Sequence, residues 1–196
     1  MSRRALRINN QYGYVLHSSA WRETSLIIQT FTRDHGRVAM VAKGAKRPYS
    51  SLRSVLTGFQ PVWLSWSGSS EIHTLTKAES ASIHLLSGMA MMSAWYMNEL
   101  VLKLLPREDP YPEIFTAYEN AIVDFTLKPK SLYAGILRQF EWILLDYLGY
   151  GIDAAMPDFQ APEIEVKARQ QLRQRLEQLL DKPLRTRQVL MDLQKY

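Results

Sequence analysis

The period of the hydrophobic pattern changes once along the chain, near Ser80, and this change limits the folds available to it. Before this point, apolar and polar residues alternate in short runs bounded by turn residues, as in β-strands. After it, apolar residues recur every three or four positions in longer runs, as in amphipathic helices. The sequence therefore predicts an α+β protein with two domains, strands in residues 1–80 and helices in residues 81–196.

The first domain is predicted to be a small β-barrel. Five short strands are expected, at residues 12–18, 24–32, 38–42, 57–66 and 71–79. This number of strands over so short a chain suits a barrel of the OB type. An SH3-like barrel fits the same strand count, so periodicity does not distinguish the two. We predict a five-stranded OB-type barrel.

The second domain is predicted to be all-α. The expected helices are residues 86–105, 112–127, 132–148 and 163–180, followed by a short helix at residues 186–194. Ser131 is the expected N-cap of the third helix, and Gly149 is its expected C-terminal glycine.

Charge is distributed unevenly. The formal net charge is +5, but residues 1–53 hold ten Lys and Arg against two acids, giving +8, whereas the remainder holds 14 basic and 17 acidic residues, giving −3. Such asymmetry favours a nucleic acid or another polyanion as the partner of the N-terminal part. The alternative is a solvated basic face without a specific partner. Because the charges gather on one predicted hairpin and the loop after it, we favour the polyanion.

Single-stranded DNA binding requires cations for the phosphates and aromatic rings on which bases stack. The predicted DNA-binding residues are Arg22, Arg33, Arg37, Lys43, Lys46, Arg47, Tyr49 and Arg53. Tyr14, Trp21 and Trp66 are further aromatic candidates, but Tyr49 is preferred because it lies in the polar loop. Trp63 and Trp66 are expected to share one strand face and to pack in the core.

No catalytic pattern is found in the sequence. The four histidines lack metal-ligand spacing, and no nucleophile elbow, phosphate-binding glycine loop or zinc-protease motif is present. With no cysteine, the chain can form neither disulfides nor thiolate zinc sites, which fits a cytoplasmic protein. No run of apolar residues is long enough for a membrane helix. We therefore predict a protein that is not an enzyme and needs no metal or cofactor.

A second candidate site lies on the third predicted helix. Arg138 interrupts an apolar stripe that includes Phe140, and Lys128 and Lys130 precede the helix. An apolar groove edged by cations fits an acidic peptide that ends in an aromatic residue. The residues alone favour the simpler alternative, in which the stripe is bundle core and Arg138 a solvated flank.

Several segments, in order along the chain, resemble the RecO family of bacterial recombination mediators. The matching residues are 14–18, 23–25, 31–32, 36–37, 41–45, 98–100, 137–141, 148–151 and 182–187. The resemblance implies an N-terminal OB barrel and a C-terminal helical domain. It is to the zinc-free proteobacterial members, since many others carry a cysteine motif after residues 148–150.

The resemblance also implies a function in DNA repair and homologous recombination. Members of the family bind single- and double-stranded DNA, anneal complementary strands and grip the acidic C-terminal tail of single-stranded-DNA-binding protein (SSB). With RecR they help to load RecA, so the chain is expected at the nucleoid in the cytoplasm. By this resemblance Arg138 contacts the SSB tail, together with Lys128, Lys130 and Phe140.

Two alternatives remain open. The segment between Asp153 and Lys182 is short for the family, so either the protein is compact or a segment is missing. The other functional hypothesis is an adaptor that binds only protein, through its helical domain.

Overall fold

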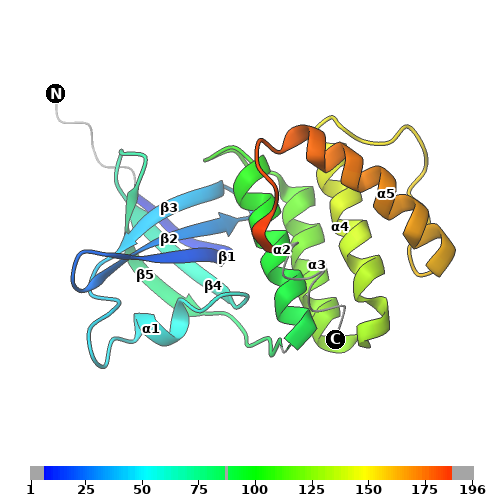
Figure 1. Ribbon diagram of the computed structural model, residues 1–196. Coiled ribbons are helices and arrows are strands. Elements are labelled where there is room, and N and C mark those ends of the chain that lie inside the picture. Colours follow the sequence, from blue (N-terminus) through cyan, green and yellow to red (C-terminus); the bar gives the residue numbers. More distant parts are fainter. Residues whose placement is uncertain (1–6, 87, 187–196) are drawn as a thin grey trace. The chain divides into compact units, whose positions relative to one another are not determined.

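A computed structural model describes residues 7–86 and 88–186 (Figure 1). These residues form two compact units. The first contains the described residues up to His84 together with Pro106–Pro110, and the second contains Leu85–Leu105 and the described residues from Tyr111 onward. The chain therefore enters the second unit, returns to the first for one short segment, and enters the second again.

The first unit is a closed five-stranded barrel. Its strands are β1 (Arg7–Trp21), β2 (Ser25–Thr32), β3 (Gly36–Ala42), β4 (Pro61–Ser67) and β5 (His73–Ser80). Their order around the barrel is β1-β2-β3-β5-β4. The β3–β5 pair is parallel and the other pairs are antiparallel. This arrangement confirms the predicted OB-type barrel.

The strands differ from the prediction mainly at their ends. β1 begins five residues earlier than expected and is 15 residues long, because it pairs first with β4 and then with β2. Most residues at the start of β1, where it pairs with β4, are polar. The register of this pairing shifts between Ile8 and Gln11. β4 begins at Pro61 rather than at residue 57. A proline is tolerated as the first residue of a strand because it cannot donate a ladder hydrogen bond.

Apolar side chains from all five strands fill the barrel. Ile28, Met40 and Leu64 are fully buried there. The segment after β3 adds Ala45 and Leu56 to the same cluster, on either side of the short helix α1 (Leu52–Val55). The basic loop that follows the hairpin is therefore attached to the core at both ends.

The segment Pro106–Pro110 is fixed against β3 and β5. The backbone N–H of Glu108 donates to the carbonyl oxygen of Arg37 at 2.9 Å, and Glu108 Oε1 lies 2.9 Å from His73 Nε2. Gly36 has a φ of +62°, and a Cβ atom there would lie 1.9 Å from the carbonyl oxygen of Asp109. Only glycine fits this position without displacing the segment.

The second unit is a helical bundle around α4. Its elements are α2 (Gly88–Leu104), α3 (Pro112–Leu127), the 3-10 helix η1 (Lys130–Leu132), α4 (Tyr133–Tyr147) and α5 (Pro162–Leu179). α4 contacts α2, α3 and α5. The prediction of Ser131 as an N-cap is wrong, since Ser131 lies within η1 and the N-cap of α4 is Leu132. Gly149 follows α4 with a φ of +81°, as predicted.

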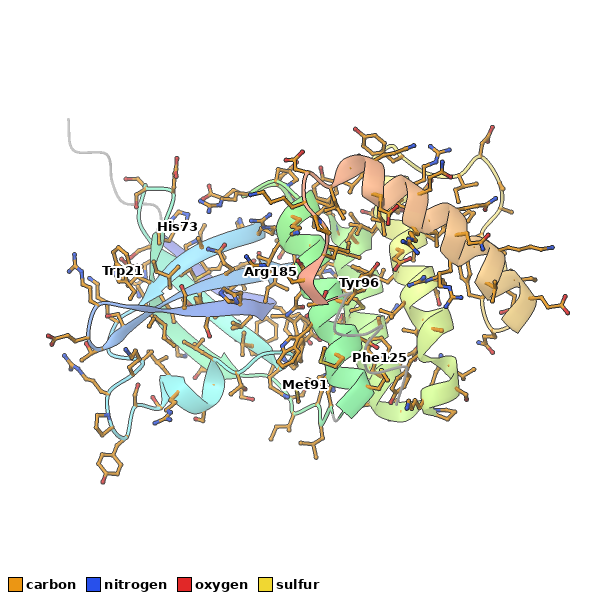
Figure 2. All side chains as sticks on the ribbon, in the orientation of Figure 1. Trp21, His73, Met91, Tyr96, Phe125 and Arg185 are labelled. Carbon is orange, nitrogen blue, oxygen red and sulfur yellow. The ribbon has the colours of Figure 1, made fainter. Side chains whose placement is uncertain are left out.

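Buried hydrogen bonds join α2 to α3 and to α4. Tyr118 Oη donates to Asn98 Oδ1 at 2.7 Å, and burial raises the pKa of the Tyr118 hydroxyl. Tyr96 Oη donates to Glu141 Oε1 at 2.6 Å, and the same oxygen accepts from Arg138 Nη2 at 2.6 Å. Figure 2 labels Tyr96 on α2. The bundle is thus fixed by polar contacts as well as by apolar packing.

The chain after α5 is attached to α2. Glu99 accepts hydrogen bonds from the backbone N–H groups of Arg185 and Thr186, at 3.0 and 2.9 Å. Burial alone would raise the pKa of Glu99, but these bonds and that of the Thr186 hydroxyl lower it below its usual value. The predicted helix at residues 186–194 lies almost wholly outside the described residues.

Candidate nucleic-acid interface

One end of the barrel carries most of the predicted DNA-binding residues. It is formed by the β1–β2 turn and by the chain from the end of β3 to α1, and we call the exposed cations and aromatic residues there the basic loop patch. The aromatic residues are Trp21 and Tyr49, and the five cations are Arg22, Lys43, Lys46, Arg47 and Arg53. Within residues 7–86 and 88–186, no ion pair joins any of these cations to an acid. Their charges are therefore available to an external anion.

Backbone hydrogen bonds hold the two parts of this patch together. The N–H of Lys46 donates to the carbonyl oxygen of Thr24 in the β1–β2 turn at 2.9 Å. The N–H of Arg47 donates to the carbonyl oxygen of Gly44 at 3.0 Å, and Gly44 has a φ of +72°. Ala45, between them, is buried in the barrel core. The cations are thus presented on a folded loop.

Two aromatic rings are exposed at the same end of the barrel. The side chain of Tyr49 is fully exposed, at 106% of the reference area. Trp21, labelled in Figure 2, ends β1 and is 44% exposed, and the guanidinium of Arg22 lies 6.0 Å from the centre of its ring. The patch therefore combines cations with aromatic faces, as single-strand binding requires.

The other aromatic candidates lie elsewhere. Tyr14 and Trp66 are buried, so neither presents a face to a base in this structure. The prediction that Trp63 shares the core face with Trp66 is wrong, because residues three apart on a strand point to opposite sides. Trp63 is 38% exposed and packs against Tyr12 of β1 at 5.0 Å between ring centres.

Arg33 and Arg37 do not join the patch. They lie at the closed end of the β2–β3 hairpin, where Thr32 pairs with Gly36, whereas the patch lies beyond the open end, where Leu26 pairs with Ala42. The length of β2 separates the two ends by about 20–25 Å. Burial and the nearby charge of Arg107 lower the pKa of Arg37.

Acidic residues surround these two arginines. The acids at this end of the barrel are Asp34, Glu71, Glu108 and Asp109. Among the described residues, these acids lie close to Arg33, Arg37 and Arg107, so charges of both signs are mixed here, which favours a polyanion less than cations alone would. The basic loop patch is the better candidate.

In the second unit the predicted peptide-binding residues do not converge on one surface. Arg138 and Phe140 are buried, at 8% and 1% exposure, and Arg138 is paired with Glu141. Lys128 is partly exposed and bound to Asp124 at 2.7 Å, while Lys130 is exposed. The role of these four residues stays a prediction.

A cavity beside Lys128 was not predicted from the sequence. It has a volume of about 200 Å³ and lies between the first turns of α4 and the loop before α5. Its lining includes Leu132, Ile136, Met156 and Phe159. The signal available in the sequence was a cluster of apolar residues in a loop that contains two prolines. Such residues pack back onto the bundle and can enclose a space.

In residues 7–86 and 88–186, no group of three or more His, Cys, Asp or Glu side chains is placed to hold a metal ion. No described helix is long and apolar enough to cross a membrane.

Comparisons with known proteins agree with the fold. Residues 6–84 match the family model described as Recombination protein O N terminal, and residues 86–156 match Recombination protein O C terminal. DNA repair protein RecO of Ralstonia nicotianae is 39% identical over 236 aligned positions, covering 96% of this chain and 86% of that protein. That alignment is longer than the 196 residues of the chain, so the relative has residues without a counterpart here.

Other relatives match over a shorter region. DNA repair protein RecO of Azoarcus sp. is 50% identical over 149 residues, covering 75% of this chain and 60% of that protein. DNA repair protein RecO of Cupriavidus metallidurans is 49% identical over 152 residues, covering 77% and 50%. In these comparisons the chain spans 50–60% of the length of the curated relatives. Taken with the two family models and the Ralstonia protein, they show that the chain belongs to the RecO family of DNA repair proteins.

Proposed function

We propose that this chain binds single- and double-stranded DNA, anneals complementary strands and helps to load recombinase onto SSB-coated single strands. It acts without catalysis, in the cytoplasm at the nucleoid, with RecR as a partner and RecA as the recombinase. The observation that carries the DNA-binding part is the basic loop patch, in which five exposed cations and two exposed aromatic rings lie at one end of an OB barrel. Cations that neutralise the phosphates of two strands also reduce the repulsion between those strands.

Salt dependence tests the electrostatic part of this proposal. Each phosphate that a cation neutralises releases condensed counterions, so the logarithm of the binding constant should fall linearly with the logarithm of the salt concentration. For five contacts to a single strand we expect a slope of about −3.5. Fluorescence anisotropy of a labelled oligonucleotide measures it. A slope near zero would rule out binding through the patch.

The helical unit is the proposed site for the acidic C-terminal tail of SSB. The cavity beside Lys128 supports this proposal, because it is large enough for an apolar side chain and Lys128 is part of its lining, which also includes one acid, Asp158. Lys130 is exposed two residues further along the chain. Asp124 already binds Lys128, so the carboxylates of the peptide would compete with it. Arg138 and Phe140 are buried in this structure and would contribute by shaping the helix that lines the cavity.

We expect the double replacement Lys128→Ala and Lys130→Ala to weaken binding of an SSB tail peptide about fivefold, since two cations facing an acidic peptide are lost. Met156→Asp should have a similar effect, because it places a negative charge on an exposed residue of the cavity lining. Isothermal titration with the peptide measures both.

Lys167→Ala with Arg169→Ala provides the matched control, since it removes the same charge from exposed positions of α5. Equal loss in the control would mean that the peptide responds only to net charge. Unchanged affinity in both test variants would place the tail elsewhere.

The alternative is an adaptor that binds only protein. The cavity is the observation that favours it, since it fits a peptide whether or not the barrel binds DNA. A gel shift with short single-stranded DNA at moderate salt separates the two functions.

A further inference from the structure

Tyr49 has the most unusual environment of the residues in the basic loop patch. Its ring is fully exposed, although burying an aromatic side chain is strongly favourable. Its backbone has a φ of +64°, in the left-handed region that bulky residues rarely adopt. An apolar ring kept in water on a strained backbone is a combination that recurs at functional sites.

The loop orders the backbone that carries this ring. The N–H of Ser50 donates to the carbonyl oxygen of Arg47 at 3.2 Å, and the N–H of Arg53 donates to that of Ser50 at 3.1 Å. Tyr49 is the third residue of the first turn, and the second turn begins directly after it. Pro48, the second residue of the first turn, has a φ fixed by its ring. The backbone that carries the ring is therefore already ordered before a ligand binds, which lowers the entropic cost of binding.

The neighbours of Tyr49 in the loop determine what such a ligand would be. Lys46 and Arg47 precede it and Arg53 follows it, all exposed. A ligand that satisfies both the ring and these charges has flat aromatic faces spaced along a chain of anions. Single-stranded DNA has this chemistry. In duplex DNA the same phosphates are present, but the base faces are covered by stacking on their neighbours.

We propose that Tyr49 stacks on an unpaired base and gives the basic loop patch its preference for single strands over duplexes. The proposal rests on the DNA binding proposed above and assigns different roles to the cations and to the ring of Tyr49. The cations bind the phosphates of either form, and Tyr49 adds affinity only where a base face is free. The protein would then hold unpaired regions and release them as pairing covers the bases, which suits strand annealing.

Three DNA probes of equal length separate phosphate binding from base stacking: a mixed-sequence single strand, a strand of the same backbone with abasic sites, and a blunt duplex. Tyr49→Ala should bind the mixed-sequence strand about tenfold more weakly than the wild type, the effect of one lost stack. It should bind the abasic strand and the duplex with wild-type affinity. Its salt slope should not change, because no charge is removed.

Tyr49→Phe is the matched variant, since it keeps the stacking face and should retain wild-type affinity for all three probes. The proposal is overturned if Tyr49→Ala binds the mixed-sequence strand like the wild type, or if it loses affinity equally for all three probes. A wild-type protein that binds none of the probes would instead overturn the proposed DNA binding itself. Since the ring is fully exposed, neither variant removes a packing contact of the folded chain.

Discussion

Replacing Glu141 with Ala should lower the free energy of unfolding of the helical unit by about 3–5 kcal/mol. Glu141 is 1% exposed, and its Oε1 accepts from Arg138 at 2.6 Å and from Tyr96 at 2.6 Å. Without this carboxylate the Arg138 charge remains buried and loses its counter-charge. Removing one partner of a buried ion pair is more costly than removing both, because the desolvation of the other is then uncompensated.

Urea unfolding followed by the helical circular dichroism signal measures this loss. The matched control is Glu177→Ala, which breaks the exposed pair with Arg173 at 2.9 Å on α5 and should cost less than 1 kcal/mol. The double replacement Arg138→Met with Glu141→Leu should recover much of the lost stability, since it removes both charges and keeps the volume. A loss below 1 kcal/mol for Glu141→Ala would show that Arg138 finds another partner or reaches water.

The burial of Arg138 also changes how its role is tested. Arg138→Ala would leave Glu141 buried without this partner, so a loss of peptide binding would report on the fold of α4 as well as on the ligand. The variants at Lys128, Lys130 and Met156 avoid this difficulty because these side chains are not buried. The spacing of Arg138 and Glu141, three residues apart on a helix, was a sign of their pairing in the sequence itself.

The fold was predictable wherever one face of an element is apolar and the other polar. This holds for β2, β3 and the four long helices, whose existence and type follow from the hydrophobic period. Prediction was poorest where a strand pairs on both edges or carries a bulge. β1 extends through polar residues because β4 pairs with them, and no local pattern shows a pairing partner 50 residues away. The prediction for Trp63 was wrong because side chains three residues apart on a strand point to opposite faces.

The candidate site was predictable in its residue types but not in their grouping. Composition indicated the cations, yet hairpin geometry decides which of them meet. Arg33 and Arg37 flank the turn, while Lys43 leaves the hairpin at its open end, so the same strands that present these residues keep them apart. The sequence does not show that the acids of Pro106–Pro110 lie beside the β2–β3 turn, because that segment is far from the turn along the chain and meets it only in the folded barrel unit.

Replacing Lys43, Lys46 and Arg47 together with Ala should weaken binding to single-stranded DNA about 100-fold at 0.1 M salt. The loss of three phosphate contacts should also make the log–log salt slope shallower by about 2. If the two proteins bind equally at 1 M salt, where electrostatic contacts contribute least, this difference in slope amounts to about 100-fold at 0.1 M salt. Their side chains are exposed, so the variant should unfold at the same urea concentration as the wild type. Anisotropy titrations over a salt series measure affinity and slope together.

The matched control is a second triple variant, Lys167→Ala, Arg169→Ala and Arg175→Ala, whose three residues are exposed on α5. Both variants have the same net charge, +2 instead of +5, so they feel the same weakened long-range attraction to DNA. If affinity depends on net charge, the two should lose it equally. If it depends on local contacts with phosphates, only the loop variant should lose both affinity and slope, because counterions are released where cations meet the backbone. Equal losses would therefore contradict the basic loop patch as the binding site, even if the protein binds DNA.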